Sequence, residues 1–254
     1  MVTVTDREDL RAWLMRDPAL HLYELGDLDD FFWPHTRWYA LGDAIALVYD
    51  APPVPALLAF GEVAQFAPLL AELRDVLPRE LYAHLSPGFY ASLAPRFASE
   101  PHGVHLKMML ADPAKLPPAA VEHLHAGDRA ELERFFADAY PTNWFDARML
   151  ETGHYVAVRD PEIVASAGVH VCAPAERVAA LGNIAVSPAR RGTGLGRRVT
   201  AGVCHSLLAA GIDRIGLNVR ADNAAAVALY SALGFAVAGQ YELHHLIARD
   251  VIIA

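Results

Sequence analysis

Apolar positions along the 254-residue chain alternate in some stretches and recur every three or four residues in others. In the first half these patterns predict helices over 6–16, 19–27, 62–76 and 88–95, and strands over 36–41, 44–49, 56–60, 81–84 and 104–110. In the second half they predict helices over 128–139, 144–152, 194–210 and 224–232, and strands over 121–125, 155–159, 163–172, 177–186, 214–219 and 235–246. Helices and strands therefore follow one another in a similar order in both halves, which indicates a structural repeat.

A proline-rich segment separates the two halves. Residues 112–118 read DPAKLPP, and proline is unfavourable in helix interiors and central strands. We therefore predict a first domain over 1–111, a linker over 112–118 and a second domain over 119–254.

Composition narrows the class of protein. Hydrophobic residues make up 54% of the chain, which suffices for a sizeable core, yet no run approaches the roughly 20 apolar residues of a membrane span. The first residues lack a basic region followed by an apolar block, so we expect no signal peptide and a cytoplasmic location. The net charge of −9 argues against nucleic-acid binding, and neither nucleic acid nor a membrane is an expected partner.

The stretch with the most distinctive chemistry is 181–198, LGNIAVSPARRGTGLGRR. A strand-like run ends at Ser187-Pro188, a turn rich in glycine and arginine follows, and a long helix begins. Glycines allow the backbone to approach a ligand closely, and the free N–H groups of a helix start bind anions. A phosphate site is therefore predicted at this turn.

Two familiar nucleotide-binding motifs do not fit this turn. A Walker loop requires Gly-Lys-Ser/Thr, whereas the last glycine here precedes Arg197-Arg198. A dinucleotide fingerprint requires GxGxxG and an acid that ends the next strand, whereas the spacing here is GxGxG and Asp213 precedes its strand.

The remaining pattern is Arg-x-x-Gly-x-Gly at Arg191, Gly194 and Gly196. It resembles the pyrophosphate loop of the GNAT N-acetyltransferase superfamily. Residues 217–235 resemble the second cofactor segment of that family, Asn-x-x-Ala-x-x-Leu-Tyr-x-x-x-Gly-Phe, with matches at Asn223, Ala226, Leu229, Tyr230, Gly234 and Phe235. The second half, including 143–155, is also similar to bacterial members akin to glycine N-acyltransferase.

The resemblance implies an α/β (α+β) fold with two GNAT-like domains in tandem. Each would be a mixed, mostly antiparallel sheet flanked by helices, with a splayed pair of strands (177–186 and 214–219) in the C-terminal domain. Acetyl-CoA would be the cosubstrate, its pantetheine arm between these strands. The implied cofactor-binding residues are Ile184, Ala185, Val186, Arg191, Gly192, Thr193, Gly194, Leu195, Gly196, Arg197, Asn223 and Tyr230. For Asn223 a plain helix N-cap is the alternative interpretation.

The first half lacks the corresponding chemistry. Its matching turn offers one glycine, Gly61, no arginine, and Glu62, which would repel a pyrophosphate. We therefore expect a degenerate domain without a cofactor site. Its aromatic residues near Trp33 and Trp38 are candidates for lining an acceptor site or for ordinary core packing.

The same resemblance implies catalytic roles. The N–H of Val186 would stabilise the oxyanion, and Tyr230 would protonate the departing thiolate. Some family members carry a glutamate base where Ala180 stands here, so the base is open. The candidates for a water-relayed base are Asn183, His170, Glu151 and His154.

The predicted activity is acyl-CoA-dependent N-acylation of a small-molecule amine by direct attack in a ternary complex, in a monomer or homodimer. A non-catalytic acetyl-CoA sensor and a protein N-acetyltransferase are the alternatives. We expect no metal, because no HExxH or CxxC motif occurs, His102/His105 and His123/His125 lack clear ligand spacing, and His244 and His245 face opposite sides of their strand. Cys172 and Cys204 lie in apolar surroundings and are expected to be buried, inert thiols.

Overall fold

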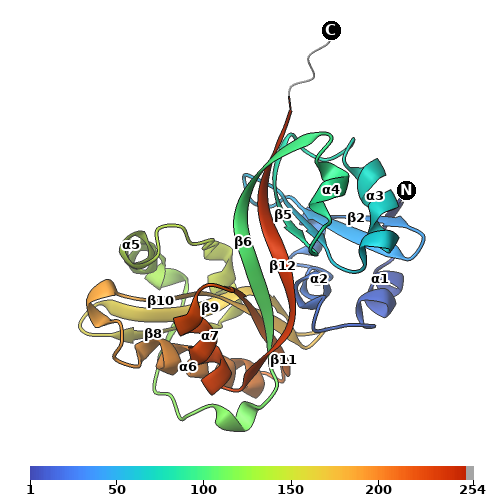
Figure 1. Ribbon diagram of the computed structural model, residues 1–254. Helices are drawn as coiled ribbons and strands as arrows, with labels where there is room; N and C mark the ends of the chain where they lie inside the picture. Colours follow the sequence, from blue (N-terminus) through green and yellow to red (C-terminus); the bar gives the residue numbers. More distant parts are fainter. Residues whose placement is uncertain (250–254) are drawn as a thin grey trace. The chain divides into compact units, whose positions relative to one another are not determined.

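The computed structural model describes residues 1–249 and divides into two compact units (Figure 1). The first unit comprises Met1–Lys107, Arg220–Asp222 and the described chain from Gly239 onward, and the second comprises Met108–Val219 and Asn223–Ala238. The predicted linker, 112–118, lies inside the second unit and holds the short 3₁₀ turn η2 (Pro113–Lys115). The domain boundaries given above stay a prediction.

The first unit is a mixed sheet with helices. Its helical segments are α1 (Arg7–Leu14), α2 (Leu22–Gly26), η1 (Trp33–His35), α3 (Val63–Leu73) and α4 (Tyr90–Leu93). Its strands are β1 (Val2–Val4), β2 (Thr36–Leu41), β3 (Ala44–Tyr49), β4 (Ala56–Ala59), β5 (Glu80–Leu85), most of β6 (Phe97–Leu110) and the end of β12 (Phe235–Ala248). The strand order is β1-β2-β3-β4-β5-β12-β6. The β4–β5 pair is parallel, whereas β12 pairs antiparallel with β5.

Apolar helix faces build the core of the first unit. Helix α3 buries Phe66, Leu69, Leu70 and Leu73, each at most 1% exposed, and contacts β2 and β3. Each such burial stabilises the fold by about 1.5–3 kcal/mol. Leu246 of β12 joins the same cluster, so the C-terminal strand is part of this core.

The second unit repeats this plan. Its helical segments are η3 (Ala126–Asp128), α5 (Arg129–Ala139), η4 (Ala147–Thr152), η5 (Pro188–Arg190), α6 (Leu195–Ala209) and α7 (Ala224–Ala232), beside η2. Its own strands are β7 (Glu122–Leu124), β8 (Tyr155–Arg159), β9 (Ile163–Ala173), β10 (Val178–Val186) and β11 (Arg214–Arg220). With the end of β6 and the start of β12, the order is β12-β6-β11-β10-β9-β8-β7. Helices α5 and α6 lie on opposite sides of β8–β10 (Figure 1).

The predicted α/β architecture and the repeat are confirmed, with three local corrections. Strand β1 was not predicted; it matches β7, so each half begins with a strand. Strand β6 starts at Phe97 rather than at 104, because Pro101 and Gly103 interrupt the pattern without ending the strand. The predicted helix 144–152 is a 3₁₀ segment that starts at Ala147 and stops at left-handed Gly153.

The helices are short. The longest, α6, has 15 residues, and within residues 1–249 no helix has both the length and the apolarity that crossing a membrane requires. Both cysteines are buried as expected, and burial raises the pKa of the Cys204 thiol to about 12. This thiol therefore stays protonated at neutral pH and is a poor nucleophile.

Candidate functional site

Strands β10 and β11 separate part of the way along their length. Their parallel register runs from Val178↔Arg214 to Leu181↔Leu217 and extends no further within the described chain. Strand β10 continues to Val186 after a bulge in which Asn183 has φ +52°. A bulge bends and twists its strand, so the last residues of β10 turn away from β11. The predicted splayed pair is thus present in the second unit.

The amide of Val186 points into the side where the strands separate. Val186 pairs with Ala165 of β9, and the next amide, that of Ser187, donates to the carbonyl of Val164 at 2.9 Å. Successive amides of an extended strand point to opposite edges. The Val186 N–H therefore points away from β9. Of its neighbours, Ile184 is half-buried and Ala185 is buried.

The glycines of the predicted phosphate loop have conformations that favour glycine. Gly192 has φ +77° and Gly194 has φ +84°, in the left-handed region. A Cβ on Gly196 would lie 3.6 Å from Cγ2 of Val186. The start of α6 therefore lies close to the end of β10.

The N-terminus of α6 is open. Its N-cap is Gly194, which has no side chain, so the first amides of the helix receive no side-chain cap. By contrast, α1 and α7 are capped by Asp6 and Asn223. The loop residues Arg191 to Gly194 are exposed, and so is Arg197. Uncapped amides at a helix start, with the positive end of the helix dipole and an arginine beside them, are suited to binding an anion.

Arg191 supports this loop from within. Its guanidinium donates to the carbonyl of Val186 at 3.4 Å and to the carbonyl of Ala139, at the end of α5, at 3.2 Å. Thr193 donates its hydroxyl to the carbonyl of Arg190 at 2.6 Å. Both side chains are thus used in shaping the loop, whereas the first amides of α6 have no side-chain cap.

Asn223 caps the start of helix α7, and Tyr230 lies in its last turn. The Oδ1 atom of Asn223 accepts from the amide of Ala226 at 3.2 Å, which is the N-cap arrangement. The Tyr230 ring is 8% exposed and packs edge-on against Phe235. Burial raises the pKa of Tyr230, with a further contribution from nearby Tyr140, so the phenol is protonated at neutral pH.

The four candidate bases differ in their surroundings. His154 is hydrogen-bonded to Ser206 at 2.9 Å, Glu151 is exposed, and Asn183 donates to the hydroxyl of Tyr155 at 3.0 Å. Burial lowers the pKa of His170 to about 4, so its imidazole is neutral at physiological pH. His170 lies against Gly182, where a Cβ would come within 1.9 Å of its Cδ2. His170 is therefore a neutral imidazole beside the point where β10 leaves β11.

Sequence reasoning did not find Tyr155. This buried tyrosine lies on β8 and donates to the carbonyl of Val169 at 3.2 Å, while it accepts from Asn183. The Oδ1 atom of Asn183 is buried and has no hydrogen-bond partner within the described residues. No local motif marks this pair, because 28 residues separate its members.

The corresponding strands of the first unit remain joined. β4 and β5 pair from Ala56↔Tyr82 to Ala59↔Leu85, and the amide of Gly61 then donates to the hydroxyl of Ser86 at 3.0 Å. This contact continues the pairing past the ends of the strands, so the arrangement seen between β10 and β11 is not repeated here.

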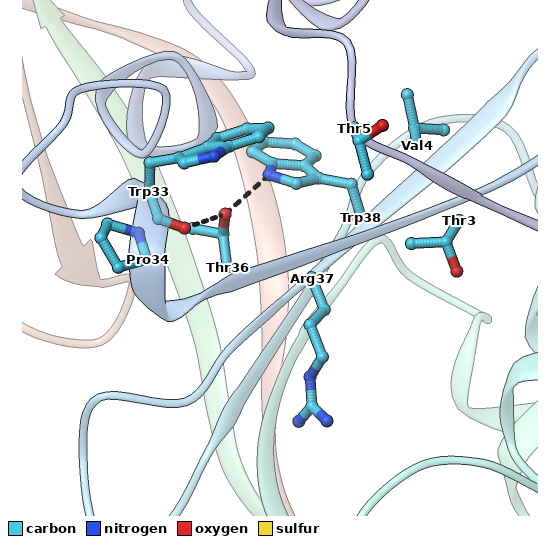
Figure 2. A pocket seen from close by; sticks show the side chains of 8 residues that line it. All are labelled: Thr3, Val4, Thr5, Trp33, Pro34, Thr36, Arg37 and Trp38. Atoms are coloured by element: carbon cyan, nitrogen blue, oxygen red, sulfur yellow. Dashed lines mark hydrogen bonds between the residues drawn. The ribbon is translucent and has the colours of Figure 1, made fainter.

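The aromatic residues of the first unit form a separate pocket. Figure 2 shows Trp33 and Trp38 beside Thr36, whose hydroxyl accepts from the Trp38 indole and donates to the Trp33 carbonyl. The cavity has a volume of about 420 Å³ and is lined by Thr3, Val4, Thr5, Trp33, Pro34, Thr36, Arg37 and Trp38. All of these residues belong to the first unit.

Several curated relatives match parts of the chain. A mycothiol acetyltransferase of Amycolatopsis mediterranei is 37% identical over 98 residues, which are 36% of this chain and 31% of that protein. A [ribosomal protein bS18]-alanine N-acetyltransferase of Escherichia coli is 47% identical over 57 residues, which are 22% of this chain and 38% of that protein. The chain thus spans about a third of the length of the curated relatives it matches.

A solved structure matches nearly the whole chain. A tandem GNAT protein from the clavulanic acid biosynthesis pathway has a TM-score of 0.53 and 16% identity, and the match covers 97% of this chain and 98% of that one. At this identity the likeness concerns the fold alone. The model of the acetyltransferase (GNAT) family matches residues 120–235, which hold both predicted cofactor segments and the splayed strands. The comparisons therefore support the GNAT acetyltransferase family for residues 120–235 of this chain.

Proposed function

We propose that the second unit binds acetyl-CoA and transfers the acetyl group to a primary amine of a small molecule in a ternary complex. One observation carries the proposal: the strands β10 and β11 separate beside the uncapped start of α6. Unpaired strand edge suits the amide groups of a pantetheine arm, and free helix amides suit a pyrophosphate.

Three segments of the second unit would bind acetyl-CoA. The backbone of Ile184, Ala185 and Val186 offers hydrogen bonds to the pantetheine amides. The amides of Gly192 to Gly196, with Arg197 beside them, hold the pyrophosphate. The Nδ2 group of Asn223 remains for the cofactor, because Oδ1 is used by the helix cap. Arg191 positions the loop through its two carbonyl contacts rather than by binding phosphate.

Two groups of the chain act on the reacting atoms. The Val186 N–H donates to the thioester oxygen as the amine nitrogen attacks the acetyl carbon, and stabilises the oxyanion that forms. Tyr230 donates its proton to the departing sulfur when the carbon–sulfur bond breaks. The raised pKa of Tyr230 keeps that proton in place until the sulfur carries negative charge.

A water molecule hydrogen-bonded to His170 would remove the proton from the amine. An alkylammonium has a pKa near 10, so the amine must lose a proton before attack. His170 is neutral at physiological pH and therefore accepts a hydrogen bond from the water that carries this proton away. With a pKa of about 4 it is a weak base, so it orients the water rather than storing the proton.

A protein amine is the second candidate acceptor. One matched relative is named a mycothiol acetyltransferase, and the other is named for an alanine of a ribosomal protein. A small amine is favoured by the longer first match, 98 against 57 residues. A third candidate, a sensor that binds acetyl-CoA without turnover, is consistent with alanine at position 180.

The test combines calorimetry with CoA and an assay of thiol release from acetyl-CoA with a panel of small amines and of peptides with free N-termini. Tyr230→Phe should reduce turnover by about 100-fold and leave CoA affinity nearly unchanged. Tyr39→Phe, in the first unit, is the matched control. CoA binding without release for any acceptor would support the sensor, and the absence of CoA binding would refute the proposal.

A further inference from the structure

Three potential metal ligands meet on one face of the first unit. Glu100 and His102 are two residues apart on β6 and therefore point to the same face of the strand. His245 comes from the neighbouring strand β12. One ligand atom from each of the three lies within 4.8 Å of the other two. The donors on β6 and the donor on β12 are far apart in the sequence and meet only because β12 lies beside β6 in the folded unit (Figure 1).

The orientation of the His245 ring is fixed on several sides. Its Nε2 atom lies 2.9 Å from Oε1 of Glu80, and its Nδ1 atom lies 3.8 Å from Oε2 of Glu100. Tyr82, directly opposite on β5, stacks on the ring with centroids 4.7 Å apart. When Nε2–H donates to Glu80, Nδ1 presents its lone pair to the side of Glu100. A histidine that ligates a metal typically has its second nitrogen held by a carboxylate in this way.

His102 carries an unsatisfied polar atom. Its Nε2 is buried and has no hydrogen-bond partner within the described residues. A buried polar atom without a hydrogen-bond partner has lost its contact with water and gained nothing in return, which destabilises a fold. The ring also lies edge-on to Tyr82 and to His245, which restricts its orientation. A ligand that accepts a nitrogen lone pair would remove this deficit.

The types of ligand atom in this cluster indicate which cations it would bind. Two imidazoles and one carboxylate, with a water in the remaining position, are ligands that zinc accepts. Magnesium and calcium prefer sites made of oxygen atoms. Ligand atoms about 2.0–2.1 Å from a tetrahedral zinc lie about 3.4 Å apart. The three ligand atoms lie within 4.8 Å of one another, so each pair has to approach by at most about 1.4 Å for an ion to bind.

We propose that Glu100, His102 and His245 form a site for Zn²⁺ or a similar first-row divalent cation, with Glu80 orienting His245. The bound ion would join β6 to β12 and so fasten the last strand to the first unit. This site is independent of acyl transfer, since all four residues lie in the first unit. Motif-based reasoning expected no metal, because 143 positions separate His102 from His245 and no ligand spacing is visible.

The experiment titrates the metal-free full-length chain with Zn²⁺ by calorimetry and with Co²⁺ by visible absorption. One equivalent should bind, the Co²⁺ spectrum should indicate nitrogen ligation, and the melting temperature should rise with Zn²⁺. His102→Gln and His245→Gln should each weaken Zn²⁺ binding at least 100-fold, and Glu80→Gln about tenfold. His205→Gln is the control, because His205 is an exposed histidine of the second unit that contacts the Pro117 carbonyl.

Glu100→Gln keeps the inference testable if a histidine variant does not fold, because Glu100 is exposed and its replacement leaves the core unchanged. Its Zn²⁺ affinity should fall at least tenfold. Absence of binding by the wild-type chain would overturn the inference. So would stoichiometric binding that survives in all of the site variants.

Discussion

Gly182 offers a direct test of the geometry at the splayed strands. A Cβ at this position would lie 1.9 Å from Cδ2 and 2.2 Å from Nε2 of His170. Contacts this short do not occur between real atoms, so Gly182→Ala forces either the ring or the strand to move. The displaced strand is the one that carries the Val186 amide.

The expected size of the effect follows from two opposing terms. Overpacking in a well-packed region typically destabilises by 1–3 kcal/mol. Replacing glycine by alanine also reduces the entropy of the unfolded chain, which favours folding by about 0.4–1 kcal/mol. Gly182→Ala should therefore lower the free energy of unfolding by about 1–2 kcal/mol. We also expect at least a tenfold loss of acetyl transfer, because the oxyanion donor moves.

The free energy of unfolding in urea is measured for four proteins: the wild type, Gly182→Ala, His170→Ala and the double variant. Removing the ring makes room for the methyl group, so the double-mutant cycle should show a coupling of about 1–3 kcal/mol. Gly127→Ala is the control, since a Cβ there would have no atom within 4 Å and should change stability by less than about 0.5 kcal/mol. A neutral Gly182→Ala, or additive effects in the cycle, would refute this geometry.

Three further predictions concern charge. Lys107 is buried in the first unit, and its Nζ atom lies 3.9 Å from Oε2 of Glu24. Lys107→Met leaves the Glu24 carboxylate without this partner and should lower the free energy of unfolding by about 3–5 kcal/mol, whereas adding Glu24→Gln should recover much of that loss. An unaltered denaturation midpoint in the single variant would contradict this. Burial lowers the pKa of His170 to about 4 and of His84 to about 3, so between pH 6.5 and about 4 the unfolded chain binds protons that the folded chain does not. Stability should therefore fall as the pH decreases through this window, and a double glutamine variant should show a shallower slope of unfolding free energy against pH. Arg191→Gln should weaken CoA binding about tenfold in calorimetry, because the loop loses both carbonyl contacts; equal affinity would show that the loop keeps its shape without them.

Much of the fold followed from local pattern. The predicted bounds of β2, β3, β8 and α7 agree with the structure to the residue, because each has a clear period and breakers on both sides. The left-handed glycines at 192 and 194 likewise follow from local sequence. Strand β1 was missed because a three-residue strand has too little pattern of its own and depends on its pairing with β2.

The remaining features depend on contacts between distant segments. The sequence of one strand does not show whether it stays hydrogen-bonded to its parallel neighbour. Strand β10 leaves β11 at a bulge, whereas the Ser86 hydroxyl, just after β5, accepts a hydrogen bond from the amide of Gly61, just after β4. The use of Arg191 for carbonyl contacts depends on where α5 ends, and the meeting of His102 with His245 depends on β12 lying beside β6. The sequence alone determined the elements, the repeat and the chemistry of the phosphate loop, since these depend on residues within a few turns of one another. Tertiary structure decided which strand edge is open and which side chains are already occupied, because hydrogen bonds and burial join groups that the chain itself keeps far apart.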